Sequence, residues 1–319
     1  MRAPRGMESH YAHMFVDDVH SHLFPIGGEV KKDGGPAATL VVDSGADSSL
    51  IERMVTFGFG VRDTYARHEF AAAFVEWATY CAHSLIRTGR AWFELAPIRS
   101  PALSQPVGFR ILPIYAGTVH RRYRWWGPYV QRVASSTLTD EDDETNPVED
   151  TSHTAIELGR ADRIFEVALP AHLREFHRAA VRLADLGEDH FPSFMMPSFA
   201  AGPTRVPYDF DVFRRTEQVA VAAATRRIGW YGRGTFNDYQ TEYYSMARRL
   251  QFERMLHDLR EVMFVSANKI LERAGAAIGF RAHIAQGALP TVDDINHATS
   301  MLEEGQISAA ALLERFSFY

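Results

Sequence analysis

Two short motifs near the N-terminus contain residue types that could do chemistry. Asp43 follows the apolar run TLVV and precedes Ser44 and Gly45. If two such carboxylates, one from each of two chains, shared a proton, they could activate a water molecule for hydrolysis. His20 and His22 are separated by one residue, so on a β-strand both would face the same side and could bind one metal ion.

The first motif, LVVDSGADSSLI at 40–51, resembles the active-site turn of aspartic proteases, particularly the retropepsins. That resemblance implies a homodimer, because the chain has no second Asp-Thr/Ser-Gly triplet to partner Asp43. It also implies an all-β fold, whereas a helix is expected from about Thr64. The simpler interpretation is a strand at 39–43, a tight turn and a short helix at 48–57. A retropepsin-like aspartic protease that works as a homodimer through Asp43 is therefore an alternative function.

The second motif, DDVHSHLFP at 17–25, resembles the first-strand Asp-x-His-x-His signature of the amidohydrolases. The resemblance implies further His ligands and a final Asp at the ends of later barrel strands, and the required alternation of strands and helices does not follow. We expect instead a His-bearing N-terminal arm over residues 1–38, with no bound metal. A metal-dependent hydrolase that uses His20 and His22 is a further alternative.

The composition excludes several classes of protein. Of the 319 residues, 46% are hydrophobic and 23% are charged, which is typical of globular domains. The net charge of −6 excludes a chain that is basic overall and binds nucleic acid through that charge. The single cysteine, Cys81, cannot form an internal disulfide and indicates a reducing compartment. No apolar run approaches the ~18 residues of a transmembrane helix, and we expect no membrane contact and no cofactor.

The first half of the chain mixes helices and strands. Residues 64–87 are predicted to form a helix, because apolar residues recur there at three- and four-residue steps. These residues are Phe70, Phe74, Trp77, Cys81 and Leu85. Alternating or β-branched runs predict strands at 91–95, 109–114, 123–133 and 164–169.

The second half is predicted to be mainly helical. Helices are expected at 171–186 and 208–228, separated by an irregular connector at 187–207 that is rich in Pro, Phe and Met. The Gly-rich segment GWYGRGTFN at 229–237 then precedes a long helix over 238–274. Leu256, Leu259, Met263 and Ile270 lie on or near one face of this helix and are predicted to be buried. Small helical elements are expected to close the chain.

In this order, the elements resemble a tailed-bacteriophage portal protein, the head-to-tail connector ring subunit. The matching stretches are RTGRAWFELAPI at 87–98, VGFRILPI at 107–114, DRIFEVALP at 162–170 and MLEEGQIS at 301–308. The resemblance covers roughly residues 40–316 and rests on the order of elements rather than on an invariant signature. The fold class that it implies is α+β: a mixed wing domain with strands, long stem and wing helices, and a helical C-terminal end.

The resemblance also implies a division of the chain. After the arm at 1–38, residues 39–170 correspond to the α+β wing and residues 171–228 to the stem helices, with a short clip-like connector at 187–207. Residues 229–237 correspond to the tunnel loop, and residues 238–319 to the long wing helix and the helical C-terminal region.

The function that the resemblance implies is structural rather than enzymatic. It implies a homo-oligomeric ring, expected to be a dodecamer, at the capsid vertex of the virion, assembled in the host cytoplasm. The ring would conduct double-stranded DNA during packaging and ejection, and would bind terminase, the major capsid protein and a head-tail adaptor. No catalytic residue and no metal ligand are implied. The residues expected to meet DNA in the channel are Gly229, Trp230, Tyr231, Gly232, Arg233, Gly234 and Asn237.

Overall fold

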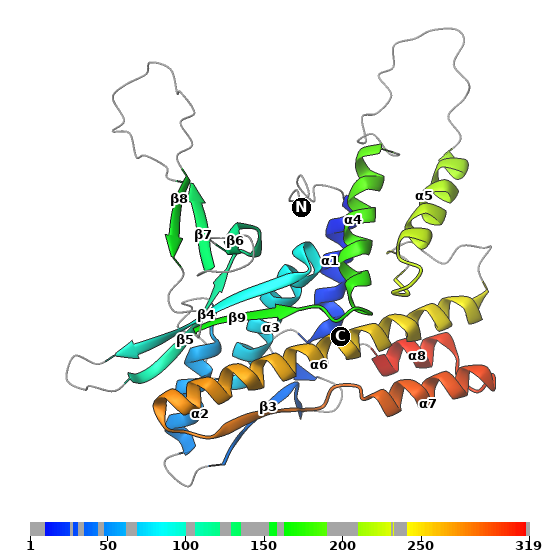
Figure 1. The fold of residues 1–319 in the computed structure, drawn as a ribbon. Helices are drawn as coiled ribbons and strands as arrows, with labels where there is room; N and C mark the ends of the chain where they lie inside the picture. The colour runs from blue at the N-terminus through cyan, green and yellow to red at the C-terminus, as the bar shows by residue number, and fades with distance from the viewer. Residues whose placement is uncertain are drawn as a thin grey trace, which may run out of the picture.

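The structure is a computed structural model. It describes residues 10–25, 28–30, 35–43, 48–61, 69–99, 106–121, 129–134, 153–157, 163–189, 210–230, 232 and 241–316. Within these ranges the chain is a mixed α+β protein, the coarse fold class expected from the sequence (Figure 1).

The helices follow one another along the chain with strands between them. They are α1 (His10–Leu23), α2 (Ser48–Phe59), α3 (Phe70–Thr88), α4 (Arg174–Asp189), α5 (Phe210–Ala224), α6 (Glu242–Ile278), α7 (Val292–Glu303) and α8 (Ala309–Phe316). The C-terminal elements are largely helical, as predicted.

The strands form small antiparallel sheets. They are β1 (Glu29–Val30), β2 (Gly35–Pro36), β3 (Ala38–Val42), β4 (Arg90–Arg99), β5 (Pro106–Ile114), β6 (Val119–Arg121), β7 (Tyr129–Ala134), β8 (His153–Glu157), β9 (Ile164–Ala168) and β10 (Ala282–Gln286). The sheet orders are β1-β2, β10-β3, β5-β4-β9 and β6-β7-β8.

The long helix α6 is the central element of the fold. It spans 37 residues, begins at an N-cap in which the Thr241 side chain accepts a hydrogen bond from the Tyr244 backbone N–H, and ends at Gly279 with φ of 96°. The predicted apolar face is confirmed, since its residues are at most 1% exposed. They are Leu256, Leu259, Met263 and Ile270.

The helix α3 packs against the sheet β5-β4-β9, and its predicted apolar stripe is buried throughout. The ring of Trp77 lies 5.4 Å from that of Phe93 on β4 and 5.5 Å from that of Phe59 on α2, measured between ring centroids. These aromatic contacts join the helix, the sheet and α2 into one core.

The N-terminal segment differs from the loose arm that the sequence suggested. Residues 10–23 form α1, and its side chains Phe15 and Val19 are fully buried between α3, α4 and α6. Together with Tyr11 and Leu23 they recur every four residues, which places them on one helical face. The many His and Asp residues between them hid this pattern.

The strand β10 was also missed by the sequence reasoning. It pairs with β3, and Ile284 lies opposite Leu40. The strand is short and its neighbours in sequence are helical, so local composition gave little signal. Its partner β3 lies more than two hundred residues earlier, which is a pairing that no local pattern encodes.

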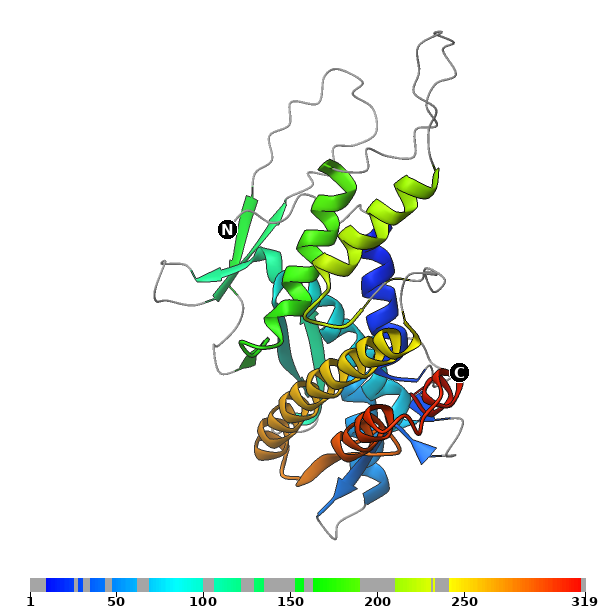
Figure 2. The same ribbon diagram turned by 90° about the vertical axis from the view of Figure 1, so that its right-hand side faces the viewer.

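The helices α4 and α5 rise side by side from the body, crosswise to α6, in both views (Figures 1 and 2). The helix α4 begins at Arg174, three residues later than predicted, because residues 171–173 form a turn in which the Leu173 N–H donates to the Pro170 carbonyl at 3.0 Å. Residues 190–209, which cover most of the predicted connector, lie outside the described residues.

Candidate functional site

The turn that joins α5 to α6 contains the start of the predicted DNA-channel loop. Of that loop, Gly229, Trp230 and Gly232 are described, and Gly229 and Trp230 are buried. Tyr231, Arg233, Gly234 and Asn237 lie outside the described residues, so a contact of this loop with DNA stays a prediction.

Gly229 permits the close approach of the turn to α6. Its φ is 92°, in the left-handed region, and an added Cβ would lie 2.4 Å from the Arg248 carbonyl oxygen and 2.7 Å from the Phe252 nitrogen. A side chain at this position would therefore push the turn away from the long helix. The glycine is required by the approach of two backbones rather than by loop flexibility.

Trp230 ties the turn to the N-terminal helix. Its side chain is 3% exposed, and its indole N–H donates to the Asp18 carboxylate at 2.9 Å. The Trp230 ring also meets the Phe15 ring edge to face at 5.2 Å. The first residues of the predicted loop are thus part of the core, and the segment that follows them starts from a fixed point.

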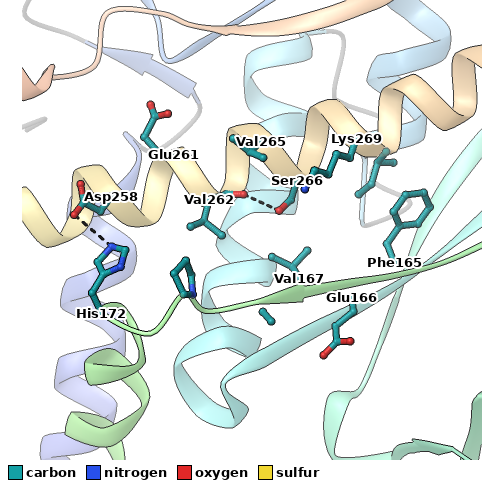
Figure 3. A pocket seen from close by; sticks show the side chains of 13 residues that line it. Phe165, Glu166, Val167, His172, Asp258, Glu261, Val262, Val265, Ser266 and Lys269 are labelled. Carbon is teal, nitrogen blue, oxygen red and sulfur yellow. Dashed lines mark hydrogen bonds and ion pairs between the residues drawn. The ribbon is translucent and has the colours of Figure 1, made fainter. Parts of the chain in front are cut away.

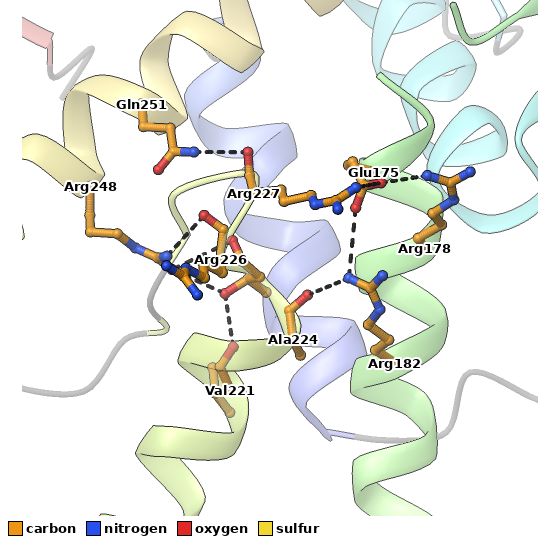
Figure 4. Close-up of polar contacts among 10 residues, drawn as sticks. Glu175, Arg178, Arg182, Val221, Ala224, Arg226, Arg227, Arg248 and Gln251 are labelled. Atoms are coloured by element: carbon orange, nitrogen blue, oxygen red, sulfur yellow. Dashed lines mark hydrogen bonds and ion pairs between the residues drawn. The ribbon is translucent and has the colours of Figure 1, made fainter. Parts of the chain in front are cut away.

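Arg248 on α6 donates hydrogen bonds to carbonyl groups of the turn that follows α5. It donates to the carbonyl oxygens of Trp230 at 2.6 Å and of Arg226 at 3.1 Å (Figure 4). Both carbonyls lie beyond Ala224, the last residue of α5, so the guanidinium group satisfies backbone oxygens of the turn itself. The hydroxyl of Thr225 also donates to the Trp230 carbonyl. Gln251 adds a bond to the Arg227 carbonyl at 3.0 Å.

A buried carboxylate joins α4 to the same turn. The Glu175 side chain is 8% exposed, and Arg178 and Arg227 contact its Oε1 atom at 2.5 and 3.1 Å. Arg182 approaches its Oε2 atom at 3.6 Å and donates to the Ala224 carbonyl at 3.3 Å (Figure 4). This network clamps α4, α5 and the turn into one unit.

The arginines control the ionisation of Glu175. Burial alone would raise the pKa of this carboxyl, but the hydrogen bonds from Arg178 and Arg227 outweigh it and hold the pKa below its ordinary value. Three cations surround one anion, and Arg227 and Arg178 remain 71% and 52% exposed. The cluster therefore keeps guanidinium groups in contact with solvent.

These contacts hold the turn between α5 and α6 rigidly against α1, α4 and α6, and we call this unit the joint. Around the turn, these side chains hold backbone carbonyls and the carboxylates of Asp18 and Glu175. Among the described residues there, no nucleophile is paired with a general base. The sequence assigned Gly229 and Trp230 to a DNA-channel loop and did not single out Asp18, Glu175 or Arg248. Their partners lie 212, 52 and 18 residues away in sequence, so only the fold reveals them.

Asp43, the residue of the protease alternative, lies at the end of β3. Its carboxylate is 53% exposed and lies 3.5 Å from Nδ1 of His283 on β10. The strand pairs with β10 in a two-stranded sheet between helical elements. The residues after it, Ser44–Asp47, lie outside the described residues. What surrounds Asp43 is a mixed α+β structure rather than the all-β fold that the protease resemblance implies.

His20 and His22, the residues of the hydrolase alternative, lie on helix α1 rather than on a strand, which corrects that expectation. The ring of His20 lies 5.6 Å from that of His83 on α3, whereas the ring of His22 lies 6.0 Å from that of Phe252 on α6. Residues two positions apart point to different sides of a helix, so the two rings do not converge on one site. Among the described residues, no group of three or more His, Cys, Asp or Glu side chains is placed to hold a metal ion.

No description of a protein family and no curated protein matches the sequence. Solved structures give distant matches over nearly the whole chain. A chain of the structure described as "Virion of native gene transfer agent (GTA) particle" matches with a TM-score of 0.45 and 9% identity, covering 98% of this chain and 91% of that one. A chain of "Neck of empty GTA particle computed with C6 symmetry" matches with a TM-score of 0.48 and 10% identity, covering 96% and 90%. At TM-scores below 0.5, neither likeness establishes the fold or the function.

In the described part of the chain, no helix is both long and apolar enough to cross a membrane.

Proposed function

We propose that this chain is the subunit of a portal-type ring, the structural conduit for double-stranded DNA at a capsid vertex. The observation that supports the proposal is the joint itself. Two adjacent helices, α4 and α5, stand crosswise to the 37-residue helix α6, and the turn between α5 and α6 is fixed by Arg248 and Trp230. In a ring, the helix pair serves as the channel-facing stem and α6 as the wing helix behind it.

The loop at 229–237 is proposed to meet the DNA. Trp230 lies in the core, so the contact with DNA is assigned to the residues that follow it in the sequence. Arg233 and Asn237 would touch phosphates transiently while DNA slides past. A net charge of −6 suits a conduit, because strong neutralisation of phosphates would retain the DNA.

The remaining assignments follow from the same proposal. Residues 39–170 form the wing, 171–228 the stem with its clip-like connector, and 238–319 the wing helix and C-terminal region. The partners are further copies of the chain in a dodecameric ring, terminase, the major capsid protein and a head-tail adaptor. The ring assembles in the host cytoplasm and resides in the virion.

The size of the assembly tests the proposal against its alternatives. We expect mass photometry of the purified full chain to show one large closed oligomer. A dimer that cleaves peptides and loses that activity in Asp43→Asn would instead support the aspartic protease. A monomer that copurifies with zinc and loses it in His20→Asn would support the hydrolase. Either result would overturn the portal proposal.

The loop has a separate test. Deleting residues 232–235 removes the segment beyond Trp230 while leaving that anchor in place. We expect the shortened chain to assemble normally but to package or retain less DNA in a particle assembly assay. Normal packaging would reduce the loop to a connector, and failure to assemble would place it in the contact between subunits.

A further inference from the structure

A groove runs between α6 and the strand β9, with a volume of about 510 Å³. Figure 3 looks into this groove, with α3 behind α6. Phe165 and Val167 of β9 form one wall, and Val262 and Val265 of α6 form the other. Within the described residues, β9 pairs only with β4, so its second edge faces the groove without a partner strand.

The α6 wall combines apolar and charged positions in one stripe. Glu261, Val265 and Lys269 follow one another at four-residue steps and are exposed, and half of the Val265 surface is accessible. Glu261 has no ion-pair partner among the described residues. Asp258 lies at the end of the groove, 3.6 Å from the His172 ring. The groove is therefore apolar at its centre, and the carboxylate of Glu261 on its rim is available to a partner.

A ridge of complementary character lies on α2. Leu50, Arg53 and Phe57 follow one another at three- and four-residue steps, and Leu50 and Phe57 are 57% and 53% exposed. Arg110 of β5 lies over the Phe57 ring at 5.5 Å. Val107, also on β5, is 44% exposed. Large apolar side chains in an exposed cluster with arginines are typical of protein interfaces.

The ridge and the groove belong to different elements of the molecule. The helix α2 packs against α3 and β5, and in Figure 1 it passes behind the C-terminal end of α6. The groove is formed by α6 and β9. One copy can therefore offer its ridge to one neighbour and its groove to another, which is the head-to-tail arrangement that closes a ring.

We propose that the α2 ridge of one copy docks into the α6–β9 groove of the next copy. Phe57 and Leu50 enter the apolar centre against Val265, and Arg53 meets Glu261 at the rim. A helix that lays an apolar face into a groove is a common mode of recognition, and Phe and Arg are effective anchors. The inference rests on the proposed ring and adds which two surfaces form its repeating contact.

A charge exchange tests the contact between Arg53 and Glu261. We expect Arg53→Glu and Glu261→Arg each to raise the protein concentration needed for assembly by about tenfold or more, because like charges then face each other. The combined variant should restore assembly. Circular dichroism of each variant checks that the fold is intact, and Glu314→Arg on α8, an exposed carboxylate away from both surfaces, is the matched control.

A disulfide trap tests the contact between Phe57 and Val265. The only native cysteine, Cys81, is fully buried, and burial raises the pKa of its thiol, so it does not compete. We expect the variant with both Phe57→Cys and Val265→Cys to form a ladder of covalent oligomers on oxidation. Pairing Phe57→Cys with Leu313→Cys on α8 is the control that should not cross-link.

The outcomes separate this inference from the proposed ring. Closed oligomers that neither cross-link nor respond to the charge exchange would overturn the ridge-and-groove contact and leave the ring standing. A wild-type chain that remains monomeric at every concentration would overturn both. Cross-linking together with rescue in the charge exchange would support both.

Discussion

The two halves of helix α6 bury different kinds of side chain. In the half from Glu242 to Arg260, three charged residues are at most 5% exposed: Arg248, Glu253 and Arg260. In the half from 261 to 278, the buried positions are apolar or glycine. Both halves bury apolar residues, but only the first also buries charged ones, so we call them the charged half and the apolar half.

The charged half holds the ends of other helices. Arg260 donates to the carbonyl oxygens of Leu23 at 2.6 Å and His22 at 2.7 Å, at the end of α1. Arg248 donates to backbone carbonyls in the turn after α5. Glu253 is the counter-ion, 2.8 Å from Arg249 and 3.9 Å from Arg260. Because helix ends expose unpaired carbonyls, Arg260 fixes the end of α1 against α6, and Arg248 fixes the turn after α5 in the same way.

The apolar half contributes buried apolar surface and no such directional hydrogen bonds. Met263, Phe264 and Ile270 pack into the common core. Apolar contacts are non-directional, so this half stabilises the fold but tolerates small shifts. The joint proposed to carry function is therefore built from directional bonds, whereas the body behind it is built from packing.

The largest expected loss of stability comes from removing a buried cation of the charged half. Arg260→Met leaves the α1 carbonyls without their donors and removes a cation from beside Glu253. Burial already lowers the pKa of Arg260 to about 10 and raises that of Glu253. We expect a loss of about 3–5 kcal/mol in the free energy of unfolding, measured by urea denaturation. Arg254→Met, whose side chain is 45% exposed, is the control and should cost less than about 0.5 kcal/mol. An equal effect of the two variants would remove the distinction between the halves.

A core substitution in the apolar half should have a different kind of effect on the structure. Ile270→Ala creates a cavity at a site that is 1% exposed, and we expect it to cost about 2–5 kcal/mol. Hydrogen exchange should then show uniform loosening of the core, whereas Arg260→Met should selectively expose the end of α1. If Ile270→Ala also released α1 selectively, the two halves would not play separate roles.

Acid should weaken the contact between α1 and its neighbours. Burial lowers the pKa of His20 from 6.5 to about 4, with nearby His83 adding to the shift and Asp17 opposing it. Burial also lowers the pKa of His83, where Arg87 and His13 add to the shift and Asp17 again opposes it. The unfolded chain therefore binds more protons than the folded chain in this window, so stability is lost as the pH falls from about 6.5 towards 4.

We expect His20 to account for about 1–3 kcal/mol of this loss. His20→Asn should flatten the dependence of the unfolding free energy on pH, even if the variant is less stable at neutral pH. His297→Asn, an exposed position on α7, should leave the slope unchanged. A slope that His20→Asn does not alter would assign the acid sensitivity to other groups.

The smallest effect is expected where the joint meets α1. Trp230→Phe keeps an aromatic ring beside Phe15 but removes the donor to Asp18. We expect a cost of about 1–2 kcal/mol, because a buried hydrogen bond to a charged group is lost while packing is largely kept. Thermal unfolding of Trp230→Phe and of Trp230→Phe with Asp18→Asn should give the same value if the bond is the whole effect.

The sequence predicts the periodic helices of this fold, but not the contacts that join them to one another. The apolar steps of α3 and α6 are strong, local signals, and both helices form. The helix α3 begins at Phe70 rather than at 64, and α6 covers Glu242–Ile278 rather than 238–274. The helix α1 was missed because polar residues interrupt its four-residue repeat. The bond between Trp230 and Asp18 could not be predicted, since it joins residues 212 positions apart. A loop with three glycines in six residues can be noticed in a sequence, but its contact with DNA stays a prediction.

Cryo-electron microscopy of the purified full chain tests the central claim most directly. The account predicts closed rings around a central opening, with α4 and α5 facing that opening and α6 lying crosswise behind them. Monomers or two-fold dimers at every concentration would contradict it, and so would rings in which α4 and α5 face outward.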